Sequence, residues 1–256
     1  MQDFIQTQIN GHVLIITLNR PQARNAFNLA MAMQMEGIID AYDEDTNLRA
    51  AIIQAEGPTF SAGQDLIAAA RGERAVSKVR GGFGIMGIPP SKPIIAAVEG
   101  QALAGGMELT LCCDIVVASR ASVFGLAEAK RGLVAIGGGC FRLPKRIPYQ
   151  IAMELILTAK PRSAEDMARF GFVNRVVEPG EAFAEAMKFA ALIARNGPLA
   201  VRASKEIAVA SVRDQWTELE AWQNQRTIVE PVMKSKDLQE GLRAFAEKRD
   251  PVWSGE

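Results

Sequence analysis

The sequence predicts an α/β fold in which buried strands alternate with helices. Three short apolar runs have the length and composition of buried strands, at residues 49–56, 93–99 and 114–119. Helical patterns fall between them, which is typical of repeated crossover units. The chain has 256 residues, of which 48% are hydrophobic, so it is long enough to bury a large core.

The N-terminal part is expected to form a hairpin followed by a helix. The dipeptide Asn10-Gly11 is typical of a tight turn and precedes the apolar run VLIITL, so we predict a hairpin over residues 8–20. His12 lies at this turn and is expected to be a structural or surface residue. Apolar residues recur near helical spacing over residues 28–45, which predicts a helix.

The sequence after about residue 148 has an almost entirely helical pattern, with one strand expected at residues 173–177. The Asn-Gly-Pro at residues 196–198 ends one helix and starts another. We therefore predict a core unit over residues 1–197 and a helical unit over residues 198–256. The helices are predicted at residues 150–158, 163–170, 181–195, 198–210, 215–229 and 238–248.

The predicted helix at residues 215–229 carries an apolar stripe that is large for the little chain left to cover it. Either this stripe packs back onto its own domain, or a partner subunit covers it. The stripe comprises Trp216, Leu219, Trp222, Ile228 and Val229.

Composition excludes several function classes. Lys plus Arg and Asp plus Glu both number 29, so no overall field favours nucleic acid or an anionic membrane as a partner. Three cysteines, two of them adjacent, disfavour a disulfide framework or a zinc cluster and indicate a reduced compartment. The N-terminus lacks the pattern of a signal peptide, and no apolar run approaches the roughly 18–20 residues that span a bilayer. We expect a soluble, cytoplasmic protein.

The single histidine limits the available chemistry. A metal site built from several histidines is excluded, and a hydrolase triad would depend on His12 alone. Acid–base catalysis then falls to carboxylates, Lys, Tyr or Cys, and we expect neither a metal nor a redox cofactor.

The glycine-rich stretch at residues 82–87 matches the dinucleotide-binding pattern G-x-G-x-x-G in letters only. That motif must open a helix, whereas Pro89 and Pro90 follow at once, so we predict a flexible loop. The cations of the longer loop at residues 68–90 are expected to form a solvated face: Arg71, Arg74, Lys78 and Arg80. Ser61 lacks the preceding glycine of a nucleophile elbow, and no phosphate-binding loop of the G-x-x-x-x-G-K-[ST] type occurs.

Two further features have alternative interpretations. Cys112 and Cys113 lie in an apolar helical run and are expected to pack in the core. The glycines at residues 137–139 precede FRLPKRIP. They either start a helix whose N–H groups face an anion or form a flexible turn.

Glycine-containing turns after two predicted strands are the candidate site. Gly105-Gly106 follows PIIAAV and leads into a helix, which places Glu108 in the first helical turn. Residues 59–66 follow RAAIIQAE in the same arrangement, and two such turns can direct two N–H groups at one oxygen. Glu128 lies one strand and one turn beyond Glu108. Each glutamate alone is typical of a solvated helix end.

Together these motifs resemble the enoyl-CoA hydratase, or crotonase, superfamily from end to end. The resemblance rests on NRP and RNAF near the N-terminus, then on SAGQDL, KPIIAAVEGQALAGGMEL, CDIVVAS, FGLAEAKRGL and EGLRAFAEKR. It implies a crotonase-like β-β-α spiral core with a C-terminal α-helical trimerisation region. It also implies acyl-CoA as substrate, a role in fatty acid metabolism, no cofactor beyond the substrate's CoA, and a homotrimer or a dimer of trimers.

The resemblance also implies roles for particular residues. The N–H groups of Gln64 and Gly105 would hold the thioester oxygen, and Glu108 and Glu128 would be the two catalytic glutamates of a hydratase. Which of the two is the acid and which the base stays open, because a coupled pair titrates jointly. The CoA moiety would be bordered by Ala23, Arg24, Ala62, Gln64, Asp65, Leu66 and Gly105.

With both glutamates present, the resemblance predicts the addition of water to a trans-2-enoyl-CoA. The alternatives are a Δ3,Δ2-enoyl-CoA isomerase, a carnitinyl-CoA dehydratase-like member, and a non-catalytic acyl-CoA-binding protein. Ala127 and Ala135 stand where the family often has proline, and Ile136 borders the expected position of the reacting water. These departures bear on the acyl group that the chain accepts.

Overall fold

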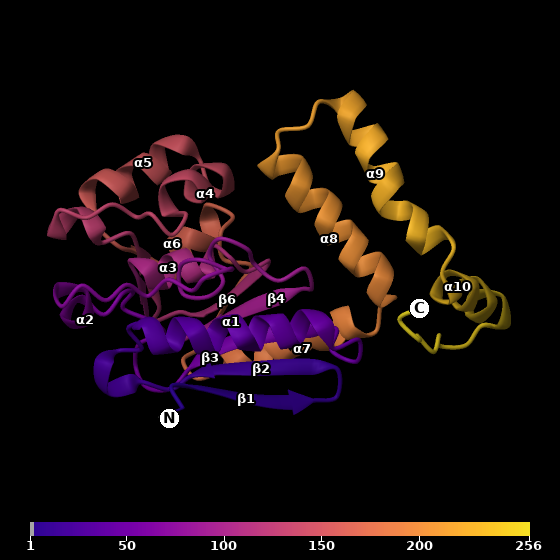
Figure 1. Cartoon of the computed structure of the whole chain (residues 1–256), viewed down its shortest axis with the longest axis horizontal. Helices are drawn as coiled ribbons and strands as arrows, with labels where there is room; N and C mark the ends of the chain where they lie inside the picture. The colour runs from indigo at the N-terminus through magenta and orange to yellow at the C-terminus, as the bar shows by residue number, and fades with distance from the viewer. Residues whose placement is uncertain (1–2) are drawn as a thin grey trace.

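The computed structural model describes residues 3–256, and the predicted α/β fold is confirmed (Figure 1). Within these residues, six strands form the larger sheet in the order β1-β2-β3-β4-β6-β9. The β1–β2 pair is antiparallel and the remaining pairs are parallel. The strands are β1 (Ile5–Asn10), β2 (Val13–Leu18), β3 (Ala50–Ala55), β4 (Ile94–Val98), β6 (Ile115–Ser119) and β9 (Arg175–Val177).

Helices cover both faces of this sheet because its strands are apolar on both sides. In β3, Ala51 and Ile53 belong to the core under α1 (Leu29–Glu44), whereas Ala50 and Ile52 pack with α7 (Ala182–Ala194). Figure 1 shows both helices alongside the sheet. The side chain of Asn28 accepts a hydrogen bond from Met31 N and so caps α1.

Three successive segments share one architecture: a strand in the larger sheet, a short strand in a second sheet, and then a helix. The second segment is β4, β5 (Gln101–Leu103) and α3 (Gly105–Thr110). The third is β6, β7 (Val123–Gly125) and the 3₁₀ helix η2 (Glu128–Arg131). In the first segment, which begins with β3, Ser61 forms a single bridge to Ala102 in place of a short strand, and α2 (Leu66–Ala70) follows. The turns that lead into the helices of the three segments are thereby stacked side by side.

The later helices match the predicted ones to within a few residues. Between them, the short strand β8 (Arg162–Ser163) pairs antiparallel with β7. Near the N-terminus, the short 3₁₀ helix η1 (Pro21–Ala23) precedes α1. The helices are α4 (Gly139–Arg146), α5 (Tyr149–Thr158), α6 (Ala164–Arg169), α8 (Pro198–Arg213), α9 (Glu218–Met233) and α10 (Lys236–Glu247).

Helices α8 and α9 form an arm that extends away from the sheets (Figure 1). No residue of α9 is buried, and Leu219 and Trp222 are 68% and 57% exposed. The chain therefore covers the stripe only in part, because Trp216, Ile228 and Val229 are half-buried while Leu219 and Trp222 stay exposed. The C-terminal tail returns to the core, where Trp253 Nε1 donates to Arg195 O at 2.7 Å.

The loop after α2 differs from the prediction of a flexible, solvated segment. Arg80 is buried, and its guanidinium pairs with Asp40 at 2.6 Å and Asp43 at 2.8 Å, both on α1. Phe83 stacks on Phe27 with ring centroids 4.2 Å apart. Arg71, Arg74 and Lys78 are exposed as expected. Pro89 and Pro90 correctly exclude a nucleotide-binding helix after the glycines, but long-range ion pairs and ring stacking fix the loop.

Candidate active site

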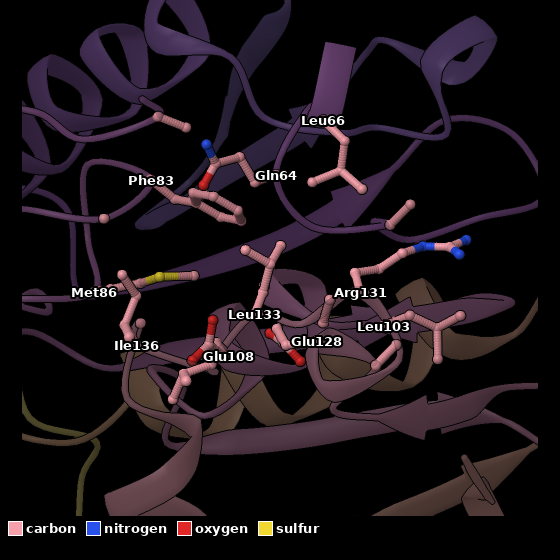
Figure 2. Close-up of a pocket in the computed structure, with 18 of the residues that line it drawn as sticks. Gln64, Leu66, Phe83, Met86, Leu103, Glu108, Glu128, Arg131, Leu133 and Ile136 are labelled. Atoms are coloured by element: carbon pink, nitrogen blue, oxygen red, sulfur yellow. The ribbon is translucent and has the colours of Figure 1, made fainter. Parts of the chain in front are cut away.

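The candidate site is a cavity of about 640 Å³ bordered by all three strand–strand–helix segments. Seven of the predicted site residues line it: Arg24, Ala62, Gln64, Leu66, Gly105, Glu108 and Glu128. Figure 2 shows the carboxylates of Glu108 and Glu128 beside one another, with Gln64 and Phe83 facing them across the cavity. The structure thus brings together residues that lie up to 104 positions apart in the sequence.

Tight backbone packing brings Gln64 and Gly105 together. Gly63 has φ +94°, and an added Cβ there would lie 2.8 Å from Gly105 N, so only glycine permits this approach. Ala104, just before α3, is held at φ 52° and ψ −127°, a strained conformation for a residue with a side chain. The chain turns there, and Gly105, the first residue of α3, lines the cavity.

Two backbone N–H groups at this turn are available to a ligand. Neither Gln64 N nor Gly105 N donates a hydrogen bond to any of residues 3–256. Two free N–H donors in one wall of a cavity form a binding site for an oxygen that becomes negatively charged.

Glu108 lies on α3, is 5% exposed, and accepts a hydrogen bond of 2.9 Å from Gly139 N. Burial raises its pKa, and the N–H groups of Gly139 and Gly137 and the charge of Arg142 oppose that rise. Gly139 begins α4, so the glycine run starts a helix and is not merely a turn. The group that the first N–H of this helix faces is the carboxyl group of Glu108.

Glu128 occupies a different environment at the start of η2. Its Oε2 atom is buried without a hydrogen-bond partner among residues 3–256. Burial raises the pKa of Glu128 to about 7, and the negative charge of nearby Glu108 contributes to the rise. Neither glutamate is the solvated helix end that each would be in isolation.

Arg142 connects two walls of the cavity. Its Nη2 donates to Met86 O at 2.6 Å and its Nη1 to Gly137 O at 3.2 Å, so it ties the loop at residues 82–87 to the start of α4. Sequence reasoning missed this residue, and it also missed Phe83 and Met86 as cavity residues. Large apolar side chains between the glycines of residues 82–87 are the signal that distinguishes a packed loop from a polar turn.

Two of the residues expected to border CoA lie outside the cavity lining. Asp65 caps α2 by accepting from Ile67 N and Ala68 N, and it pairs with Arg20 at 2.8 Å. These contacts lower the pKa of Asp65 against the raising effect of burial, which is the largest. Ala23 ends η1 beside the lining residue Arg24. Asp65 therefore holds the backbone that carries Gln64 and Leu66.

The described residues offer little support for other kinds of site. Cys112 and Cys113 are buried free thiols, as expected, and Cys140 is an exposed one. Residues 3–256 contain no cluster of three His, Cys, Asp or Glu side chains able to hold a metal ion. Within the same residues, every helix is too short or too polar for a bilayer crossing.

Comparison with known proteins gives one consistent family. A family model described as enoyl-CoA hydratase/isomerase matches residues 8–256. A carnitinyl-CoA dehydratase from Salmonella enteritidis is 40% identical over 267 residues, covering 100% of both chains. Enoyl-CoA hydratase EchA19 from Mycobacterium tuberculosis is 40% identical over 94% of this chain and 92% of its own. A crystal structure of enoyl-CoA hydratase from M. tuberculosis superposes with a TM-score of 0.96, at 47% identity and 100% coverage of both chains.

These similarities confirm the spiral core with its helical C-terminal region as the fold of the crotonase superfamily. The chain belongs to the enoyl-CoA hydratase/isomerase family, and it is an enzyme of the hydro-lyase type.

Proposed function

We propose that this chain adds water across the double bond of a trans-2-enoyl-CoA thioester and yields a 3-hydroxyacyl-CoA. One observation carries the proposal: Glu108 and Glu128, both with raised pKa values, share a cavity with the free N–H groups of Gln64 and Gly105. An acid, a base and an oxyanion site are the groups that hydration needs.

The two carboxylate environments support distinct roles. The hydrogen bond from Gly139 N and the charge of Arg142 favour an ionised Glu108, whereas Oε2 of Glu128 has no donor among residues 3–256 and this carboxyl group keeps its proton more readily. In the proposed reaction, Glu108 accepts a proton from water as the water oxygen bonds to C3. The double-bond electrons move onto the thioester oxygen, which the N–H groups of Gln64 and Gly105 stabilise. Glu128 then delivers its proton to C2, and proton exchange with solvent resets the pair.

The CoA part of the substrate is assigned to the cationic side of the cavity. Arg24, Lys130 and Arg131 line it, and the only acidic side chains in the lining are the two glutamates assigned to catalysis. Arginine and lysine side chains are suited to the phosphates of CoA. No metal or redox group is needed for any step.

The test is a turnover assay with crotonyl-CoA and longer and branched enoyl-CoAs, followed by loss of the enoyl absorbance. Hydration should occur at rates typical of enzymes, with kcat above about 1 s⁻¹ for the preferred chain. Isomerisation of a 3-enoyl-CoA without hydration would favour an isomerase. Acyl-CoA binding with no turnover would identify a binding protein.

Carnitinyl-CoA dehydration is the second candidate because a carnitinyl-CoA dehydratase matches the whole chain at 40% identity. It is the same chemistry in reverse on a cationic acyl group, so carnitinyl-CoA belongs in the same assay. A preference for carnitinyl-CoA over alkyl 3-hydroxyacyl-CoAs would select it.

We also propose that the protein works in the cytoplasm as a trimer or a dimer of trimers. The exposed apolar stripe of α9 supports assembly, because a second copy can bury what one chain leaves in water.

A further inference from the structure

A second apolar cavity lies directly beside the candidate active site. It measures about 180 Å³ and is separate from the catalytic cavity, but Glu128, Leu133 and Val134 line both. One wall of the active site is therefore also a wall of this second cavity. The remaining lining residues are Leu126, Ala129, Ala135, Cys140, Ile156 and Leu157.

The shared wall is a loop rather than a packed element. Leu133 and Val134 lie between η2 and α4, and their side chains are 49% and 65% exposed. The backbone is held by Leu133 N donating to Glu128 O at 3.1 Å, while the two side chains have no core packing to keep them in place. Their rotamers can change without opening the protein core.

The acyl end of the active site is suited to an alkyl group. Phe83, Met86, Leu133 and Ile136 surround the two carboxylates in Figure 2, and all four side chains are apolar. The cation on this side, Arg142, is already bonded to Met86 O and Gly137 O. With both carboxylates assigned to catalysis, no acidic side chain of the lining remains to pair with a cationic acyl substituent.

We propose that the distal carbons of the acyl chain pass between Leu133 and Val134 into the second cavity, so that the substrates are enoyl-CoAs with unsubstituted alkyl chains longer than four carbons. This inference rests on the proposed function for its substrate class. The second cavity reaches the surface at Leu157, which is 69% exposed, so chains long enough to reach that point gain nothing from further methylenes.

The expected effect follows from the burial of methylene groups. Each buried methylene is worth about 0.8 kcal/mol, or roughly fourfold in affinity. We therefore expect affinity for saturated acyl-CoAs, and kcat/KM for the matching enoyl-CoAs, to rise at least about tenfold from four carbons to ten. Carnitinyl-CoA, whose acyl chain ends in a cation, should be a poor substrate.

The test compares wild type with Leu157→Trp, which places a larger side chain at the second cavity, and with Leu192→Trp as the matched control. Leu192 is a 60% exposed leucine on α7 that lines neither cavity. Calorimetry with butyryl-CoA and decanoyl-CoA should show that Leu157→Trp weakens decanoyl-CoA binding at least about fivefold. Butyryl-CoA binding and crotonyl-CoA turnover should stay within about twofold, and Leu192→Trp should change neither.

A second measurement uses the unmodified protein. Cys140 lines the second cavity and is exposed, whereas burial raises the pKa of Cys112 to about 11 and also raises that of Cys113, so an alkylating reagent reports on Cys140. Saturating decanoyl-CoA should slow alkylation at least about fivefold more than saturating butyryl-CoA does.

The outcomes separate this inference from the proposed function. Equal affinity for both chain lengths, or equal protection of Cys140 by both, overturns the inference even if crotonyl-CoA is hydrated. Chain-length-dependent binding and protection without hydration support the subsite and refute the hydratase proposal. A change in oligomer mass on Leu157→Trp would identify the second cavity as an interface between copies, which also overturns the inference.

Discussion

Gly139 N donates a 2.9 Å hydrogen bond to Oε1 of Glu108, so the first residue of α4 holds a carboxylate carried by α3. Glu128, in the same cavity, has a buried oxygen without a partner among residues 3–256. Two side chains of one type thus occupy different electrostatic environments. In the proposed mechanism, this difference allows one to act as base and the other as acid.

Removing either carboxyl group should stop proton transfer and leave binding intact. Glu108→Gln and Glu128→Gln should each lower kcat for crotonyl-CoA hydration by at least about 10²-fold, with the Kd for a saturated acyl-CoA within a few-fold of wild type. Steady-state kinetics and calorimetry measure the two quantities. Full hydratase activity in the Glu128→Gln enzyme would rule out the two-carboxylate mechanism.

The activity should depend on pH through the glutamate pair. Glu128 must be protonated to act as acid, so kcat/KM should fall as pH rises through its pKa of about 7. Glu108 must be ionised, so kcat/KM should also fall as pH drops through the pKa of Glu108. A rate profile from pH 5 to 9 with a stability control checks both limbs, and a flat profile above pH 7 would contradict the role of Glu128.

The two titrations should be coupled in a measurable direction. The charge of Glu108 helps to raise the pKa of Glu128, so Glu108→Gln should lower that pKa. Carbon-13 NMR of the Glu128 carboxyl group reports it directly. An unchanged value would show that the two carboxylates do not interact.

The oxyanion role of Gly105 can be separated from its lack of a side chain. An added Cβ at Gly105 would lie 2.5 Å from Cζ of Phe83, so Gly105→Ala should lose activity by a clash, not by losing the N–H. Phe83→Leu in the same chain should relieve that clash. Gly105→Pro removes the donor, so its loss of about 10²–10³ in kcat should persist with Phe83→Leu.

Circular dichroism and oligomer mass must match wild type before these rates are compared, because proline also restricts Ala104. If a folded Gly105→Pro enzyme keeps near-normal kcat, the thioester oxygen is not bound at this N–H.

The apolar stripe of α9 predicts an oligomer, and the resemblance to the crotonase superfamily implies that it is built on three subunits. Light scattering coupled to size exclusion should give a mass that is a multiple of three chains. Trp222 is 57% exposed in the single chain, so Trp222→Glu should yield smaller species by burying a charge at the interface. A wild-type monomer at micromolar concentration would argue against this assembly.

The buried guanidinium of Arg80 should contribute to stability. Arg80→Met leaves Asp43 without its partner and frees the loop that carries Phe83, so the free energy of unfolding should fall by about 2 kcal/mol. Lys78→Met, two residues away and exposed, is the control and should change it by less than about 0.5 kcal/mol. Equal urea midpoints for both variants would mean that the Arg80 pairs are not stabilising.

The regular elements with strong periodicity could be predicted from the sequence, including α1 and the buried strands β3, β4 and β6. The short strands β5 and β7 could not, because three residues are too few to show alternation. The bridge between Ser61 and Ala102 depends on contacts across 41 positions, which no local pattern contains.

The residues of the candidate site also divide into those that the local sequence predicts and those whose roles depend on distant partners. Sequence and resemblance identify the positions of the two glutamates and of Gly105, because fixed spacing from a strand end determines where they lie. The burial of Arg80 and the stacking of Phe83 on Phe27 depend on partners far along the chain, so composition suggested a solvated loop instead. The structural role of Asp65 could not be predicted from the sequence either, since its ion pair with Arg20 is visible only in three dimensions.

The stacked strand–strand–helix segments also make the site modular. The first segment supplies the Gln64 N–H, the second Gly105 and Glu108, and the third Glu128. Backbone N–H groups do not depend on side-chain identity, so mutation at position 128 leaves both oxyanion donors in place. A lineage could therefore exchange its proton donor while keeping the ability to stabilise an enolate. New reactions could arise on this scaffold one segment at a time, without a non-folding intermediate.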